Sequence, residues 1–79
     1  MSRSKGEIIA NILEICLTVS SKTVIVNGSH LNFRTLNPYL DSLVEHGFIA
    51  VIEGDPLKYE TTDKGKELLA VIRKTNELF

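Results

Sequence analysis

Hydrophobic residues recur every three to four positions over residues 8–19, which is the spacing of a helix with a buried side. Ser4 and Glu7 precede this stretch with the spacing of a capping box, in which each side chain binds a backbone N–H of the other residue. We therefore predict a helix over about residues 5–19. Because its apolar positions cover nearly the whole circumference, this helix either forms the centre of the core or turns one flank toward a partner subunit.

The next segment, residues 22–28, is ambiguous between a strand and a helix. The β-branched run from Thr23 to Val26, followed by Asn-Gly, is typical of a strand that ends in a tight turn. Thr23 could equally cap a short helix that Gly28 ends. Local propensity favours the strand, whereas the elements that follow favour the helix, so both assignments stay open.

A second long helix is predicted over about residues 33–46, with Asn32 as its cap and Gly47 as its end. Proline inside a helix removes a backbone hydrogen bond and clashes with the preceding turn. The helix is therefore expected either to start at Pro38 with Asn37 as its cap, or to bend there. Its apolar side consists of Phe33, Leu36, Leu40, Leu43 and Val44.

A β-hairpin and a final helix complete the chain. Residues 48–52 and 57–61 have strand composition, and the Glu-Gly-Asp-Pro segment between them is typical of a turn. Thr62 is placed to cap a helix over residues 63–79, which would be about 25 Å long. We expect a wing-like hairpin over residues 48–61 followed directly by this helix.

Composition places the chain among ordinary globular proteins. It has 79 residues, of which 43% are hydrophobic and 24% are charged, so one domain spanning residues 1–79 is expected. No apolar run approaches the length of a membrane span, and the N-terminus does not resemble a signal peptide. We therefore expect a cytoplasmic, nucleoid-associated protein with no membrane partner.

The sequence offers few residues of the kinds that catalyse reactions or bind metal ions. Cys16 is the single cysteine, and it forms no zinc-binding spacing with His30 and His46. The glycines form no phosphate-binding loop, and no serine, cysteine or aspartate has the surroundings of a nucleophile. We expect no enzyme activity, no metal and no cofactor, and a core this small leaves little room for a small-molecule pocket.

Charge is distributed unevenly although the net charge is only −1. The first forty residues carry four basic and two acidic side chains, whereas the remaining residues carry five basic and eight acidic ones. No acidic residue occurs between Ile15 and Leu40. This acid-free stretch is the minimum that a surface for a polyanion requires.

The predicted order of helix, short element, helix, hairpin and helix is that of a winged helix-turn-helix, an α+β fold that is mostly α. The chain also resembles the small archaeal winged-helix DNA-binding proteins and predicted transcriptional regulators. The residues that carry this resemblance are Thr23-x-Ile25, Leu31, Tyr39-Leu40-x-x-Leu43, Gly47-Phe48-Ile49, Tyr59-x-x-Thr62-x-x-Gly65 and Leu68-Leu69. The resemblance implies a two-stranded β-hairpin wing and a C-terminal helix that pairs with its copy in an antiparallel coiled-coil dimer.

Candidate DNA contacts gather around the second long helix. Arginine can bind guanine through two hydrogen bonds, and asparagine can bind adenine in the same way. Glu53 and Asp55 at the wing tip would repel phosphate, so the wing is not expected to clamp the minor groove. The candidate DNA-binding residues are Lys22, Ser29, His30, Asn32, Arg34, Thr35, Asn37 and Lys58.

Dimerisation is predicted through the last helix. Leu68, Ile72, Thr75 and Phe79 recur at a spacing close to that of a coiled-coil seam, and Leu69 with Ile72 and Phe79 forms a second option. In the alternative arrangement, this helix packs on the first helix of its own chain.

The function expected from these features is that of a homodimeric DNA-binding transcriptional regulator, or a small architectural protein, with residues 33–46 in the major groove of double-stranded DNA. The alternative is a winged-helix module that docks a protein partner through its acidic wing and apolar last helix. RNA binding is disfavoured because the sequence offers no exposed aromatic platform.

Overall fold

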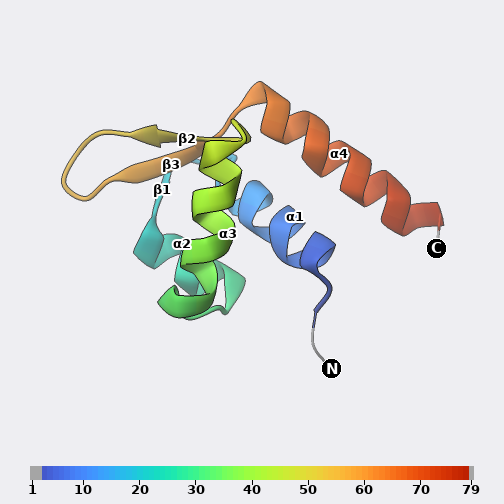
Figure 1. Ribbon diagram of the computed structural model, residues 1–79, viewed down its shortest axis with the longest axis horizontal. Coiled ribbons are helices and arrows are strands. Elements are labelled where there is room, and N and C mark those ends of the chain that lie inside the picture. Colours follow the sequence, from blue (N-terminus) through green and yellow to red (C-terminus); the bar gives the residue numbers. More distant parts are fainter. Residues whose placement is uncertain (1–2, 79) are drawn as a thin grey trace.

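The computed structural model describes residues 3–78, which form four helices and a three-stranded sheet (Figure 1). The hairpin and the last helix extend in opposite directions from a body made by the other helices, and the chain measures 41 × 29 × 19 Å. None of the helices in this range is long and apolar enough to cross a membrane. The elements are α1 (Lys5–Ile15), β1 (Ser20–Ser21), α2 (Lys22–Ser29), α3 (Phe33–Glu45), β2 (Ile49–Ile52), β3 (Lys58–Thr61) and α4 (Asp63–Leu78).

Helix α1 starts as predicted but ends earlier. Ser4 Oγ accepts a hydrogen bond from the Glu7 N–H at 3.1 Å, as the capping-box spacing indicated. The predicted extension to residue 19 is wrong, because strand β3 binds the last carbonyl groups of the helix. Thr61 Oγ1 donates to the Leu13 carbonyl at 2.7 Å, and the Thr61 N–H donates to the Cys16 carbonyl at 2.8 Å.

Residues 22–29 form helix α2, so the strand that local propensity favoured is wrong. The capping residue is Ser21, whose Oγ accepts from the Val24 N–H at 3.4 Å, and not Thr23. Ile25 and Ser29, one helical turn apart, are both completely buried, and α2 packs against α1. This burial outweighs the β propensity of an isolated Val-Ile-Val run, which depends strongly on context.

Helix α3 runs from Phe33 to Glu45 with Pro38 inside it, so a start at Pro38 is wrong. Asn32 caps the helix through its Oδ1, which accepts from the Thr35 N–H at 2.8 Å. Proline is tolerated here because Pro38 and Arg34 are exposed, so water can bind the Arg34 carbonyl that Pro38 cannot reach.

The predicted hairpin is confirmed, and β1 adds a third strand to it. The strand order is β1-β3-β2 with antiparallel pairing throughout. In this register Tyr59 on β3 lies opposite Ser20 on one side and Val51 on the other. A two-residue strand has no periodic pattern, so the sequence could not predict β1.

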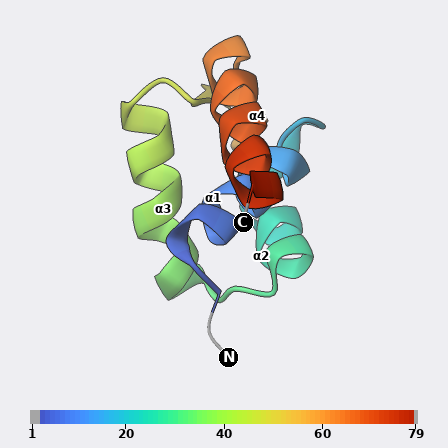
Figure 2. The same ribbon diagram turned by 90° about the vertical axis from the view of Figure 1, so that its right-hand side faces the viewer.

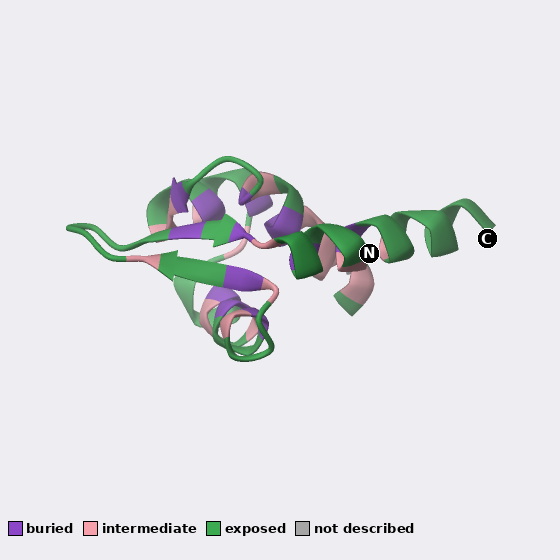
Figure 3. Cartoon of the chain, turned by 90° about the horizontal axis from the view of Figure 1, so that it is seen from above, coloured by how far each residue is buried: buried purple, intermediate pink, exposed green. Residues whose placement is uncertain are grey.

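Helix α4 crosses α1 and then continues past the body. Figure 2 shows α4 in front of α1, with α2 and α3 on either side. Leu69 is buried in the core, and Arg73 forms an ion pair with Glu14 of α1. Beyond these contacts the residues of α4 are exposed, as the view from above shows (Figure 3). The buried core consists of Ile12, Leu13, Cys16, Ile25, Leu36, Leu40, Leu43, Ile49, Tyr59 and Leu69.

Candidate nucleic-acid interface

The link between α2 and α3 fixes the start of α3 relative to the body. It contains His30, which ends α2 in the left-handed conformation with φ 58°, then Leu31 and the capping residue Asn32. The Arg3 guanidinium donates to the carbonyl of Ser29, the last residue of α2, at 2.7 Å. This contact joins the N-terminal segment to the turn and satisfies a carbonyl at the end of α2.

The first turn of α3 presents an exposed polar group. Asn32, Arg34 and Thr35 are all exposed, so the structure brings together these three predicted residues. Phe33 lies among them with 49% of its surface exposed. The apolar periodicity of α3 assigned Phe33 to the buried side, so no sequence signal indicated it as a surface residue. An arginine beside an aromatic ring and a threonine can contact base edges and a thymine methyl group.

The second half of α3 carries negative charge, in contrast to the positive charge of Arg34 at its start. Asp41 and Glu45 lie seven and eleven positions after Arg34, on the same exposed side of the helix. Carboxylates repel the DNA backbone, whereas the start of a helix favours anions through its free N–H groups. The N-terminal half of α3 is therefore the part suited to approach a polyanion.

Two predicted contacts have buried polar atoms. Ser29 is 0% exposed, and its Oγ takes part in hydrogen bonds with the backbone of Val26 and Leu31. The Asn37 Oδ1 atom is buried and has no hydrogen-bond partner within residues 3–78. Neither oxygen atom is accessible to DNA, because both residues lie on sides of their helices that face the body.

The remaining predicted cations lie around the wing. Lys22 is half-buried at the start of α2, beside Tyr59. Lys58 is exposed, but side chains alternate along a strand, so it projects from the face of β3 opposite to Tyr59. The wing tip exposes Glu53 and Asp55, as the sequence indicated.

The other side chains that could carry out chemistry or bind a ligand have structural roles. Burial raises the pKa of the Cys16 thiol to about 11, which leaves it unreactive at neutral pH. Lys64 Nζ donates to the His46 carbonyl at 2.7 Å and lies 4.8 Å from the centre of the Phe48 ring. Within the part of the chain that the structure describes, no cluster of histidine, cysteine and carboxylate side chains could hold a metal ion.

The residues predicted for dimerisation divide between two sides of α4. Leu69 is 4% exposed and belongs to the core of its own chain, so it is unavailable to a partner. Leu68 and Ile72 are half-buried, Thr75 is exposed, and Phe79 lies outside the described residues. Val71 and Leu78, which the predicted seam omitted, are 61% and 73% exposed. Leu68, Val71, Thr75 and Leu78 follow the alternating spacing of three and four residues that is typical of a coiled-coil seam, and of these Leu68 packs partly against the core while the other three are exposed.

The helix pair α2–α3, the hairpin beside it and the additional helix α4 define the protein as a winged helix-turn-helix. A winged helix-turn-helix family model matches residues 2–79, and the chain belongs to this family of non-enzymatic proteins. Among solved structures, the chain is similar to Sso10a-2, a DNA-binding protein from Sulfolobus solfataricus, with 31% sequence identity and a TM-score of 0.89. The match covers 96% of this chain and 81% of that one. No curated protein matches the chain. The likeness to Sso10a-2 agrees with the resemblance to small archaeal winged-helix proteins that the sequence indicated.

Proposed function

We propose that this protein binds double-stranded DNA as a homodimer and acts as a transcriptional regulator or a small architectural protein, inside the cell and on the nucleoid. The observation that carries this proposal is the exposed group at the start of α3, which combines Asn32, Phe33, Arg34 and Thr35 on one turn. The similarity to a DNA-binding protein over almost the whole chain supports it.

In this proposal the N-terminal half of α3 enters the major groove. Arg34 binds guanine or a phosphate, and Thr35 and the ring of Phe33 contact neighbouring bases. Asp41 and Glu45 limit how far the second half of α3 can enter the major groove, because these carboxylates would approach the phosphates of the opposite DNA strand and be repelled by them. Each protomer would therefore read a short stretch of sequence.

Dimerisation extends the contact to two half-sites. The seam of Leu68, Val71, Thr75 and Leu78 begins where α4 packs on the body and continues along the part of α4 that projects beyond it (Figure 3). Pairing of two such seams would cover the exposed Val71 and Leu78 side chains, which a monomer leaves in water. A two-fold axis between the α4 helices would place the two α3 helices on one face of the duplex, where half-sites are about 34 Å or a multiple of it apart.

Replacing Arg34 by alanine tests the proposed reading helix. We expect the affinity for each half-site to fall roughly 5- to 100-fold, since one specific arginine contact contributes about 1–3 kcal/mol. The melting temperature should change little, because Arg34 is exposed and forms no hydrogen bond or ion pair within residues 3–78. Fluorescence anisotropy with a labelled duplex measures the affinity, and circular dichroism measures the melting temperature.

Lys74→Ala is the matched control for Arg34→Ala, since it removes an exposed cation from α4, far from the start of α3. The control should retain wild-type affinity within about twofold, as expected for a distant surface charge at moderate salt. Equal losses in both variants would mean that binding depends only on total charge and would contradict the assignment of α3.

A further inference from the structure

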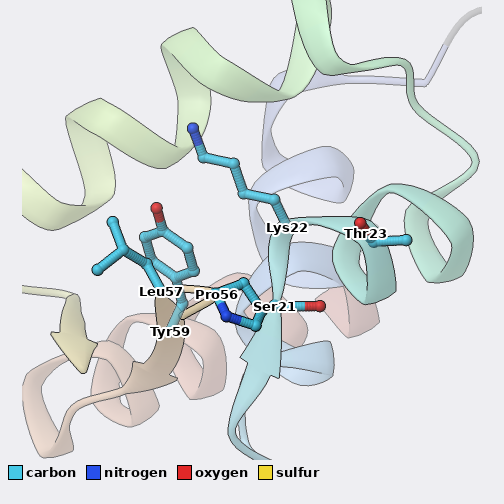
Figure 4. Close-up of a pocket in the computed structure, with 6 residues that line it drawn as sticks. All are labelled: Ser21, Lys22, Thr23, Pro56, Leu57 and Tyr59. Carbon is cyan, nitrogen blue, oxygen red and sulfur yellow. The ribbon is translucent and has the colours of Figure 1, made fainter. Parts of the chain in front are cut away.

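A pocket of about 220 Å³ lies between the start of α2 and the base of the wing (Figure 4). Its walls come from two places in the chain, the β1–α2 junction and the beginning of β3. The pocket therefore opens beside α3, on the flank where the wing and the helix pair meet. The residues that line it are Ser21, Lys22, Thr23, Pro56, Leu57 and Tyr59.

The Tyr59 hydroxyl is the polar group that this pocket leaves without a partner. Tyr59 is only 6% exposed, yet its hydroxyl forms no hydrogen bond with any group of residues 3–78. Asn37 Oδ1 is the buried side-chain oxygen that lacks a partner within residues 3–78, so the Tyr59 hydroxyl oxygen itself reaches the surface of the pocket, where water or a ligand can bind it. Figure 4 shows the Tyr59 hydroxyl and the Lys22 ammonium pointing to the same side of the pocket, toward α3. A partner from outside the chain could therefore bind both groups at once.

The groups around the pocket favour an anionic partner that accepts hydrogen bonds. Lys22 is the charged residue among those that line it, and the N–H groups of Lys22 and Thr23 in the first turn of α2 have no acceptor within the helix. Burial raises the pKa of Tyr59, and the nearby Asp41 carboxylate raises it further, so the hydroxyl stays protonated and can donate.

Asp41 also weakens the attraction for an isolated anion. With one lysine in the pocket, the Asp41 carboxylate near it and Asp55 directly before Pro56, the charged groups around the pocket carry no net positive charge. A free anion would gain little there, whereas an anion held in place by other contacts could still accept two hydrogen bonds. Pro56 and Leu57 add an apolar wall that suits a sugar ring. These properties describe one unit of a nucleic-acid backbone better than a free ion.

We propose that this pocket binds a backbone phosphate of the DNA strand that borders the major groove, with Lys22 and Tyr59 as its two side-chain donors. The neighbouring deoxyribose lies against Pro56 and Leu57. This inference rests on the proposed function and adds a positioning contact that fixes how α3 enters the groove.

Tyr59→Phe tests the phosphate pocket with a minimal change. We expect the affinity for each half-site to fall about 10- to 150-fold, since a hydrogen bond to a charged acceptor contributes about 1.5–3 kcal/mol. The slope of log affinity against log salt should not change, because the hydroxyl is neutral. The melting temperature should stay at the wild-type value, since the hydroxyl forms no hydrogen bond within residues 3–78. Lys22→Gln should instead make the slope less negative by about 1.8, since each of the two protomers loses one phosphate contact worth about 0.9.

Tyr39→Phe is the matched control, because Tyr39 is a half-buried tyrosine in a different groove, between α1 and α3. Wild-type affinity in this variant, together with weakened binding by Tyr59→Phe, would support the pocket. If Tyr59→Phe and Tyr39→Phe bound the duplex with equal affinity, the phosphate pocket would be overturned, whereas the proposal of DNA binding would stand. Absence of duplex binding by the wild-type protein would instead overturn the proposed function.

A second titration distinguishes two possible ligands of the pocket, a DNA backbone phosphate and a free phosphate ion. Replacing chloride by inorganic phosphate at equal ionic strength should lower wild-type and Tyr59→Phe affinity to the same extent, since only general screening changes. Competition by inorganic phosphate that disappears in Tyr59→Phe would identify a free anion as the ligand and overturn the proposal.

Discussion

Gly65→Ala is expected to destabilise the protein by about 2–3 kcal/mol, through overpacking at a site with no free space. Gly65 is buried in the first turn of α4, where the helix passes close to the chain before β2. A Cβ atom here would overlap the carbonyl oxygen of Phe48 and would lie 2.7 Å from the Thr61 Cγ2 methyl. Because the oxygen belongs to the backbone, α4 itself would have to move away from the sheet.

Calorimetry or thermal circular dichroism should show a melting temperature lower by roughly 10–20 °C for Gly65→Ala. Gly6→Ala is the matched control, since Gly6 lies in the first turn of α1 and the nearest atoms to its added Cβ would be 3.9 Å away. That variant should be as stable as the wild type or more stable by up to about 1 kcal/mol, because alanine favours the helix. Equal melting temperatures for both variants would contradict the packing of α4 described above.

Val71→Asp is expected to abolish the proposed homodimer, with a loss of more than about 100-fold in dimer affinity. In a two-fold interface the substitution places an unpaired carboxylate on both copies, and a buried unpaired charge costs about 3–5 kcal/mol. The fold should persist, because Val71 is 61% exposed in the single chain. Duplex affinity should fall as well, since two linked half-site contacts become one.

Light scattering coupled to size exclusion measures this change directly, because the monomer mass is 8.8 kDa. Asn76→Asp adds the same charge to α4 outside the seam, at an exposed position, and should leave the dimer intact. A monomeric wild-type protein, or equal masses for wild type and Val71→Asp, would contradict the proposed seam.

Local signals in the sequence were sufficient for the elements that carry their own caps. Ser4, Asn32 and Thr62 each accept a hydrogen bond from the backbone N–H three residues later. The hairpin followed from its turn composition. The order of these helices and of the hairpin along the chain was then sufficient to predict the winged helix-turn-helix fold.

The errors arose where contacts distant in sequence decide the local structure. Residues 22–29 are a helix because Ile25 and Ser29 are buried together, although their neighbours favour a strand. The early end of α1 depends on Thr61, which lies 48 residues after Leu13. Neither contact leaves a periodic pattern in the sequence.

The candidate site was predictable in type but not in detail. Arg34, Thr35 and Asn32 lie together because they occupy one helical turn, which spacing alone indicates. The burial of Ser29 and of the Asn37 oxygen depends on how α2 and α3 pack, and the sequence gives no measure of that. The same limit applies to the unpaired Tyr59 hydroxyl, whose pocket combines two separate segments of the chain.

The surface formed by α2, α3 and the pocket is proposed to bind duplex DNA through the backbone phosphates of the DNA. Fluorescence anisotropy of a labelled random-sequence duplex of about 30 base pairs, titrated with the protein at several salt concentrations, tests this most directly. Each neutralised phosphate contributes about −0.9 to the slope of log affinity against log salt, so two protomers that each use Lys22 and Arg34 should give a slope of about −3 to −4. A duplex that stays unbound at low salt would contradict the claim and would favour a protein partner docked on the acidic wing.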